Sequence, residues 1–250
     1  MSNTLVSIIT PSYKSEKFIA ATIKSVLSQT YTDWEMIIVD DVSPDTSNKV
    51  IDTYIQKDNR IKLIQLEQNS GPAIARNTAI ETAKGRYIAF LDADDLWLPD
   101  KLEKQIDFMS KKNLSFTYCS YRLIDEYGNP LGVFQTKKRI TYEGMLKTCS
   151  IGCLTAIYDT HILGKRYMPD ILKRQDYGLW LQLLKEINST QGIMEPLAVY
   201  RILDHSVSSN KFISAQYQWK IYREVEKLNI WKSLYYFVFY TINGIMKYRS

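Results

Sequence analysis

The sequence of 250 residues has few of the residues on which several common protein classes depend. It contains three cysteines and two histidines, and three cysteines cannot all pair, which disfavours a disulfide framework and favours a reducing, cytoplasmic setting. The first residues lack the basic stretch, apolar run and small-residue cleavage site of a secretion signal. With 45% hydrophobic and 24% charged residues, the composition is that of an ordinary globular protein and excludes a disordered or fibrous chain.

Glycine is missing where two large nucleotide-binding classes require it. The turn after the first expected strand, residues 10–13, contains no glycine, so it cannot be the fingerprint of a dinucleotide-binding dehydrogenase. Residues 69–77 do place Gly71 before a helix start and Arg76 one turn later, an arrangement that can face an anion. This segment lacks the lysine and hydroxyl ending of a P-loop, which disfavours a nucleotide hydrolase.

What the chain does have is an alternation of short apolar runs with segments of helical periodicity. The pattern predicts strands at residues 5–10, 34–40, 61–66, 86–91, 114–121 and 154–158, and helices at 16–29, 47–56, 72–82, 102–109 and 176–187. Ser15 is expected to cap the first helix. The order of the first seven elements predicts an α/β fold with a Rossmann-like, mostly parallel central sheet flanked by helices. Ligands bind such sheets at the carboxyl ends of the strands.

Acidic residues follow the second expected strand at that edge. Asp40 and Asp41 come directly after the apolar run 36–39. A carboxylate at this place can accept hydrogen bonds from a base or from a ribose hydroxyl. The alternative is that Asp40, Asp41 and Ser43 only cap the next helix.

The fourth expected strand is followed by a denser acidic cluster. Asp92, Asp94 and Asp95 come directly after the apolar run 87–91, where repulsion and desolvation disfavour three carboxylates unless a cation offsets their charge. Mg²⁺ and Mn²⁺ take one or two carboxylates and complete their shell with water and phosphate oxygens, so either ion suits the cluster. Capping of a helix near Pro99 would account for only one of the three.

Together these segments resemble glycosyltransferase family 2, a family of inverting enzymes with the GT-A fold. The resemblance rests on residues 6–13, 38–43, 69–77 and 92–94 and covers roughly residues 4–208. It implies a nucleotide-sugar site made by Pro11, Tyr13, Asp41, Arg76 and Asp92. It also implies that Asp94 is the principal metal ligand, with Asp92 beside it. Val42 stands where the family often has glycine or another small residue, a change that we expect to leave the aspartates undisturbed.

The resemblance also implies a catalytic base later in the chain. The family's acidic pair at the head of a helix corresponds to Gln175 and Asp176, so Asp176 is expected to be the general base, although on its own it can be read as a helix cap. Residues 200–208 resemble the segment that closes these domains near the donor phosphates. Arg201 and His205 are therefore expected to neutralise the diphosphate, and either can equally be structural.

The activity implied by the resemblance is an inverting transfer of a sugar from a nucleotide diphosphate sugar to an acceptor hydroxyl, with Mn²⁺ or Mg²⁺ as cofactor. UDP is favoured as the commonest nucleotide of the family, and the acceptor is expected to be a glycan or lipid-linked glycan of bacterial capsule, O-antigen or teichuronic acid synthesis. A sugar-phosphate nucleotidyltransferase is an alternative, but it needs a basic, glycine-rich first loop. A non-catalytic nucleotide-sugar or membrane-binding module is another, and Asp176 argues against it.

The positive charge of the chain is confined to its C-terminal end. Residues 205–250 hold seven basic and two acidic residues, which accounts for the whole formal charge of +5. The aromatic, apolar run 234–246 is shorter than the roughly 20 residues needed to cross a bilayer, so it predicts an interfacial helix at the inner face of the cytoplasmic membrane. The alternative is a helix packed on the catalytic domain or on the partner in a homodimer. Nucleic-acid binding is a weaker use of this charge, and no nucleic-acid partner is expected.

We expect a GT-A domain over residues 1–208 and a helical extension over 209–250.

Overall fold

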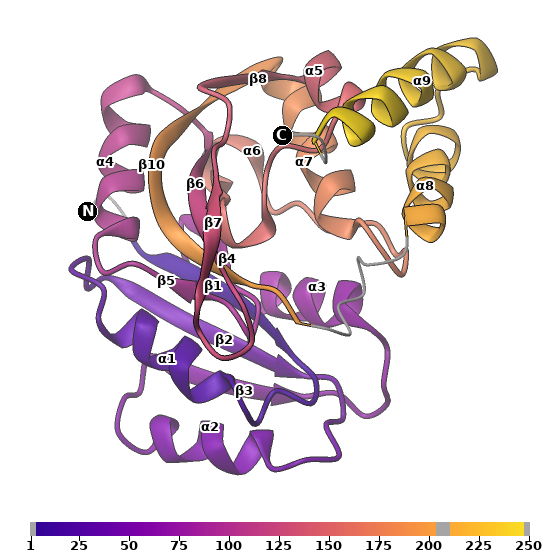
Figure 1. The fold of residues 1–250 in the computed structure, drawn as a ribbon. Coiled ribbons are helices and arrows are strands. Elements are labelled where there is room, and N and C mark those ends of the chain that lie inside the picture. Colours follow the sequence, from indigo (N-terminus) through magenta and orange to yellow (C-terminus); the bar gives the residue numbers. More distant parts are fainter. Residues whose placement is uncertain (1–3, 204–210, 248–250) are drawn as a thin grey trace.

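The computed structural model describes residues 4–203 and 211–247, which form a mixed α/β fold (Figure 1). The strands are β1 Val6–Ser12, β2 Trp34–Asp40, β3 Ile61–Gln65, β4 Tyr87–Phe90, β5 Leu96–Trp97, β6 Phe116–Ile124, β7 Pro130–Phe134, β8 Arg139–Thr141, β9 Ile157–Asp159 and β10 Ser189–Arg201. The α-helices are α1 Ile19–Leu27, α2 Ser47–Ile55, α3 Pro72–Thr82, α4 Lys101–Lys112, α5 Tyr142–Lys147, α6 Thr160–Leu163, α7 Gln175–Ile187, α8 Lys211–Lys220 and α9 Ile230–Lys247. A 3₁₀ turn spans Cys153–Thr155, and a π-helical turn spans Ile221–Val225 after α8.

One central sheet runs through the described residues in the order β3-β2-β1-β4-β9-β6-β10-β5. The first four strands are parallel, as the alternation predicts. β9 then runs antiparallel to both β4 and β6, whereas β10 pairs parallel to β6. The α/β class with a central sheet flanked by helices is therefore confirmed, and the antiparallel strands belong to its second half.

Strands β1, β2 and β4 carry buried apolar residues on both faces because helices cover both faces of the sheet (Figure 1). Ile8 and Ile38 belong to one buried cluster, which contains residues of α1, α2 and α4. Their chain neighbours Ile9 and Ile37 belong to a second cluster, which contains residues of α3 and α7. Successive side chains of a strand point to opposite faces, so the uninterrupted apolar runs fit a sheet that is buried on both sides.

Several expected boundaries differ from the observed ones. Ser15 does not cap α1, which begins at Ile19 after Phe18; the Ser15 hydroxyl instead lies 2.7 Å from that of Ser12. The stretch expected as a strand at 154–158 begins as the 3₁₀ turn and becomes extended only at Ile157. The aspartates after β4 do not cap α4, since the residue preceding that helix is Asp100.

The C-terminal helices pack against the main body of the protein. Ile221 and Tyr222 are fully buried in the cluster that contains α3 and α7, and Tyr236 and Phe237 of α9 pack against that cluster. The expected domain boundary at residue 208 lies outside the described residues and stays a prediction. Within the described ranges, no helix combines the length and the apolar character needed to cross a membrane.

Candidate active site

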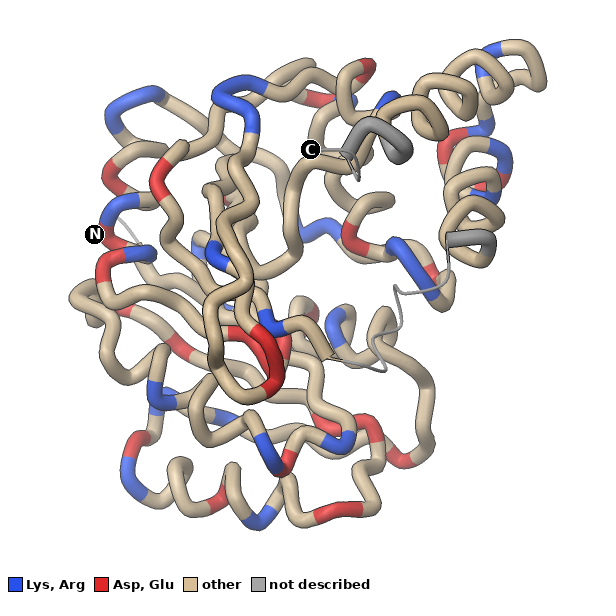
Figure 2. The backbone as a smooth tube through the Cα atoms, in the orientation of Figure 1, with Lys and Arg blue, Asp and Glu red and all other residues tan. Residues whose placement is uncertain are grey.

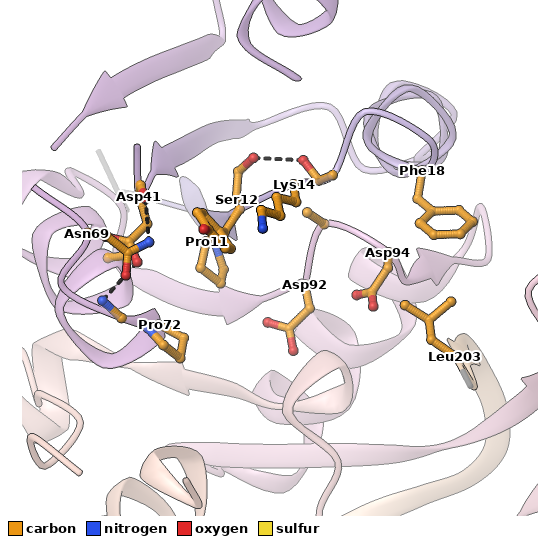
Figure 3. A pocket seen from close by; sticks show the side chains of 15 residues that line it. Pro11, Ser12, Lys14, Phe18, Asp41, Asn69, Pro72, Asp92, Asp94 and Leu203 are labelled. Atoms are coloured by element: carbon orange, nitrogen blue, oxygen red, sulfur yellow. Dashed lines mark hydrogen bonds between the residues drawn. The ribbon is translucent and has the colours of Figure 1, made fainter. Parts of the chain in front are cut away.

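A cavity of about 410 Å³ opens at the carboxyl ends of the parallel strands (Figure 3). Its wall combines the turn after β1, the loop before α3 and the segment after β4, which brings together several residues singled out in the sequence. These are Pro11, Tyr13, Asp41, Asp92 and Asp94. Tyr13 is 47% exposed at this opening, so its ring is available to a flat ligand such as a nucleobase.

Asp41 organises the adjoining loop before α3. Its two carboxylate oxygens accept hydrogen bonds from the backbone N–H groups of Ser70 at 2.6 Å and Gly71 at 2.8 Å. The loop before α3, which the sequence predicts to face an anion, therefore binds the carboxylate of Asp41. Each carboxylate oxygen has a second lone pair, so Asp41 can still accept a hydrogen bond from a ligand.

Asp40, by contrast, stabilises the turn after its own strand. Its Oδ2 accepts hydrogen bonds from the Ser43 backbone N–H at 2.9 Å and from the Asn48 side chain at 3.1 Å. Of the two neighbouring acids, Asp41 is thus the one that lines the cavity.

The residue that follows Asp41 has a strained backbone. Val42 has a φ of 61°, in the left-handed region that a β-branched residue rarely adopts. The sequence comparison with the family predicts that Val42 leaves the aspartates undisturbed, and the Asp41 carboxylate does have its loop contacts. The strain is a cost that a glycine at this position would avoid.

The three acids after β4 have different surroundings. Asp92 pairs with Arg76 at 2.6 Å. Asp94 lies beside it, and burial together with the Asp92 carboxylate raises the pKa of Asp94 to about 6. Asp95 is fully buried and accepts a hydrogen bond from the backbone N–H of Arg201 at 2.9 Å. Asp92 and Asp94 face the cavity in Figure 3, whereas Asp95 is structural.

A second cavity of about 540 Å³ continues from the first and shares Pro72, Asp92, Asp94 and Leu203 with it. Its far wall is formed by the start of α7 and by residues of the C-terminal half. Those residues are Cys149, Leu172, Lys173, Arg174, Gln175, Asp176, Tyr177, Tyr200, Arg201 and Ser214. Asp176 and Asp94, which are far apart in the sequence, therefore line the same space.

The surroundings of Asp176 suit a group that exchanges protons. Burial raises the pKa of its carboxyl, while the guanidinium of Arg76 and the backbone N–H of Tyr177 lower it. Asp176 lies in the first turn of α7 and is only partly buried, so it is both near the helix start and open to the cavity. Arg76 lies between two carboxylates that it influences, Asp92 and Asp176.

Arg201 lines the second cavity, but its side chain is largely committed to the protein. Its guanidinium donates to the backbone carbonyl oxygens of Asp94, Asp125 and Glu126 at 3.0–3.3 Å. These contacts support the structural alternative for Arg201 and leave it next to Asp94. His205 lies outside the described residues.

The cavity walls also contain residues that no sequence motif singled out. Lys14 and Phe18 line the first cavity, and Leu172 and Ser214 line the second. Phe18 packs under the Arg201 guanidinium at 4.8 Å. In the described part of the chain there is no cluster of three His, Cys, Asp or Glu residues able to hold a metal ion.

Comparisons with known proteins place the fold and the motifs in a family context. A family model described as glycosyl transferase family 2 matches residues 7–166. TuaG of Bacillus subtilis, named as a putative teichuronic acid biosynthesis glycosyltransferase, is 46% identical over 97% of each chain. WfgD of Escherichia coli, named as a UDP-Glc:α-D-GlcNAc-diphosphoundecaprenol β-1,3-glucosyltransferase, is 43% identical over 99% of this chain and 96% of its own.

A solved structure extends the likeness to the fold. The crystal structure of S. aureus TarS 1–349 in complex with UDP-GlcNAc matches with a TM-score of 0.72 and 22% identity. The match covers 89% of this chain and 65% of the TarS chain.

Proposed function

The chain belongs to glycosyl transferase family 2 and is a glycosyltransferase of polysaccharide biosynthesis, and we propose that it moves a sugar from a nucleoside diphosphate donor to an acceptor hydroxyl with inversion. The observation that carries this proposal is the pair of joined cavities. One contains Tyr13 and Asp41, the other contains Asp176, and both contain Asp94. Donor and acceptor can thus meet beside the shared aspartates.

The nucleotide belongs in the first cavity in this proposal. Tyr13 and Pro11 offer apolar surface to the base, and Asp41 retains acceptor capacity for a base N–H or a ribose hydroxyl. UDP is the proposed nucleotide, supported by the donor in the name of WfgD. The sugar and the leaving diphosphate would then lie toward Asp92 and Asp94.

Mn²⁺ or Mg²⁺ fits the shared acids. A carboxylate whose pKa is raised to about 6 by burial and by a neighbouring acid gains stability from a cation, and Asp94 is in that position. Asp94, with Asp92 beside it, would hold the ion, whose remaining ligands would be water and the donor phosphates. When bound, the ion supplies Lewis-acid stabilisation of the leaving diphosphate.

Asp176 is the proposed general base. Its carboxylate would accept the proton of the acceptor hydroxyl as that oxygen attacks the anomeric carbon from the face opposite the leaving group. A single displacement of this kind inverts the anomeric configuration. Burial raises the pKa of Asp176, and the nearby Arg76 guanidinium offsets part of that rise.

We take the acceptor to be a sugar linked through a diphosphate to a lipid, as in the name of WfgD. Such an acceptor is confined to a membrane surface, and α9 has a face suited to that surface. Its outward residues recur at helical spacing and are exposed, with Trp231 at 77%. They are Trp231, Leu234, Tyr235, Val238 and Ile242. An exposed apolar face of this kind normally marks an interaction surface.

We place this face on the inner leaflet of the cytoplasmic membrane. Figure 2 shows that the part of α9 drawn in colour is uncharged along most of its length. In the sequence of the helix, Lys232 is its third residue and Lys247 its last. Aromatic rings at head-group level with flanking basic residues are typical of interfacial helices. A second copy of the chain is the alternative occupant of the same face.

The activity is tested by screening nucleotide sugars with Mn²⁺ for nucleotide release in the presence of a short-chain GlcNAc diphosphate acceptor. We expect release and a transferred sugar with a UDP donor, and a rate that is about 10²- to 10⁴-fold lower with Asp176→Asn. A sugar 1-phosphate and a nucleoside triphosphate as the only productive pair would instead indicate a nucleotidyltransferase.

Membrane attachment is tested separately by flotation with anionic and neutral vesicles. We expect the wild type to float with anionic vesicles and the triple variant Trp231→Ser, Leu234→Ser, Val238→Ser to remain at the bottom. These residues face outward, so the variant keeps the packing of Tyr236 and Phe237. Equal flotation of both proteins, or a dimer that only the wild type forms without vesicles, would contradict the membrane assignment.

A further inference from the structure

Arg174, in the wall of the second cavity near Asp176, donates its hydrogen bonds to uncharged groups. The guanidinium of Arg174 donates to the side-chain oxygen of Gln218 at 2.6 Å and to the hydroxyl of Tyr240 at 2.5 Å. Both oxygens are uncharged. None of the ion pairs found between described residues includes Arg174.

The C-terminal helices hold this arginine in place. Gln218, on α8, is fully buried and also donates to the Tyr177 hydroxyl at 3.1 Å. The ring of Tyr240, on α9, lies 5.0 Å from the guanidinium. Arg174 itself has a left-handed backbone with a φ of 64°, a conformation that is costly for a residue other than glycine and that often occurs at functional sites.

The guanidinium groups of the other two arginines of this cavity are already bound to other parts of the protein. Arg76 is paired with Asp92, and the guanidinium of Arg201 is used by backbone carbonyls. Among the described carboxylates, the one with which Arg174 interacts electrostatically is Asp176, and no ion pair joins the two side chains. Lys173 lies next to Arg174 in the chain and lines the same cavity, so two cationic side chains lie on this wall. A preorganised guanidinium in such a wall is suited to a phosphate group.

We propose that Arg174, with Lys173, binds the phosphate that is attached directly to the acceptor sugar. This inference rests on the proposed function. The acceptor hydroxyl must reach Asp176, and Arg174 is two residues away in the chain. A hydroxyl and an anomeric phosphate on one sugar ring are separated only by that ring, so both groups can be held at once. The acceptor sugar is then the one that carries the diphosphate, and the distal end of a long glycan is not the substrate.

The test compares two acceptors, GlcNAc diphosphate on a short alkyl chain and the alkyl glycoside of GlcNAc without phosphate. We expect Arg174→Gln to lower the ratio of kcat/KM for the phosphorylated acceptor to that for the neutral one by about tenfold to a hundredfold, as expected for a lost charge-assisted hydrogen bond. Arg174→Lys should recover part of the ratio. Arg139→Gln is the matched control, because Arg139 is exposed and contacts Ser189 elsewhere, and it should leave the ratio unchanged.

Two further measurements separate the proposal from its rivals. A tenfold weaker affinity of Arg174→Gln for UDP with Mn²⁺ would assign the residue to the donor diphosphate and overturn the proposal. An equal loss of kcat with both acceptors would show that Arg174 acts only through the helix that carries Asp176. Calorimetric binding of the phosphorylated acceptor needs no turnover, so equal affinity of wild type and variant refutes the subsite even where no transfer is detected. An inactive wild type with this affinity difference would leave the subsite standing and count against the proposed reaction.

Discussion

Replacing Lys101 by methionine should make the protein more stable at neutral pH. Lys101 is the first residue of α4 and is fully buried, and its ammonium nitrogen has no hydrogen-bond partner among the described residues. A positive charge is also unfavourable at a helix N-terminus. The ring of Trp97, 4.0 Å from the nitrogen, provides a favourable cation–π contact.

The size of the effect follows from the pKa. Burial lowers the pKa of Lys101 from 10.5 to about 8, which corresponds to about 3 kcal/mol of lost stability for the charged form. The ring contact that methionine loses is worth about 1–2 kcal/mol. Lys101→Met should therefore raise the free energy of unfolding by about 1–2 kcal/mol at pH 7.

The pH dependence gives the sharper test. Below about pH 8 both folded and unfolded states bind the proton, and the full cost is present. Between about pH 8 and 10.5 the folded state has lost the proton while the unfolded state keeps it, so the wild type gains stability as pH rises. Urea unfolding of both proteins should show the advantage of Lys101→Met shrinking by about 2 kcal/mol between pH 7 and 9.5. Exposed Lys112, on the same helix, is the control, and Lys112→Met should change the free energy by less than about 0.5 kcal/mol. A difference between wild type and Lys101→Met that does not vary with pH would refute the reasoning.

Three other predictions concern the site. Asp94→Ala should abolish donor turnover and leave the circular dichroism spectrum unchanged, because its carboxylate faces the cavity; full activity in excess EDTA would contradict a metal role. Asp176→Asn should lower kcat by about 10²- to 10⁴-fold with little change in UDP affinity. Because burial raises the pKa of Asp176, kcat of the wild type should fall on the acid side as the base takes up a proton, and that limb should be absent from the residual rate of the variant. Val42→Gly should raise the melting temperature by about 2–4 °C, the equivalent of about 1 kcal/mol of relieved strain, and an unchanged or lower value would mean that the turn is not strained.

The first half of the fold is predictable from the sequence because its signals are local. Strand β2 and helix α3 have the predicted bounds, since an apolar run ends at a pair of acids in one case and proline marks the first turn in the other. The long strand β10 is not predicted. It contains Pro196 and has irregular pairing with β6 around that residue, so its sequence lacks the steady alternation that identifies a strand.

The site is predictable to the same extent and for the same reason. Parallel strands bring their carboxyl ends to one edge, so the order of the strands is enough to assign Asp41 and Asp94 to one cavity. The pairing of Arg76 with Asp92, and the use of both Asp41 oxygens by the loop before α3, depend on side-chain positions. Motif spacing carries no information about those positions.

The C-terminal extension shows why a choice between packing and membrane binding cannot be made from composition. Helix α9 repeats aromatic and apolar residues around most of its circumference, and such a helix has no single face for one partner. In the fold, Tyr236 and Phe237 pack inward and Tyr240 meets Arg174, whereas Trp231 and Val238 point outward. The packing seen in the fold and the proposed surface docking would therefore use different faces of one helix and would not compete. The inward face of α9 contacts Arg174, which lines the second cavity. A partner bound to the outward face would therefore be separated from that cavity by about the diameter of one helix.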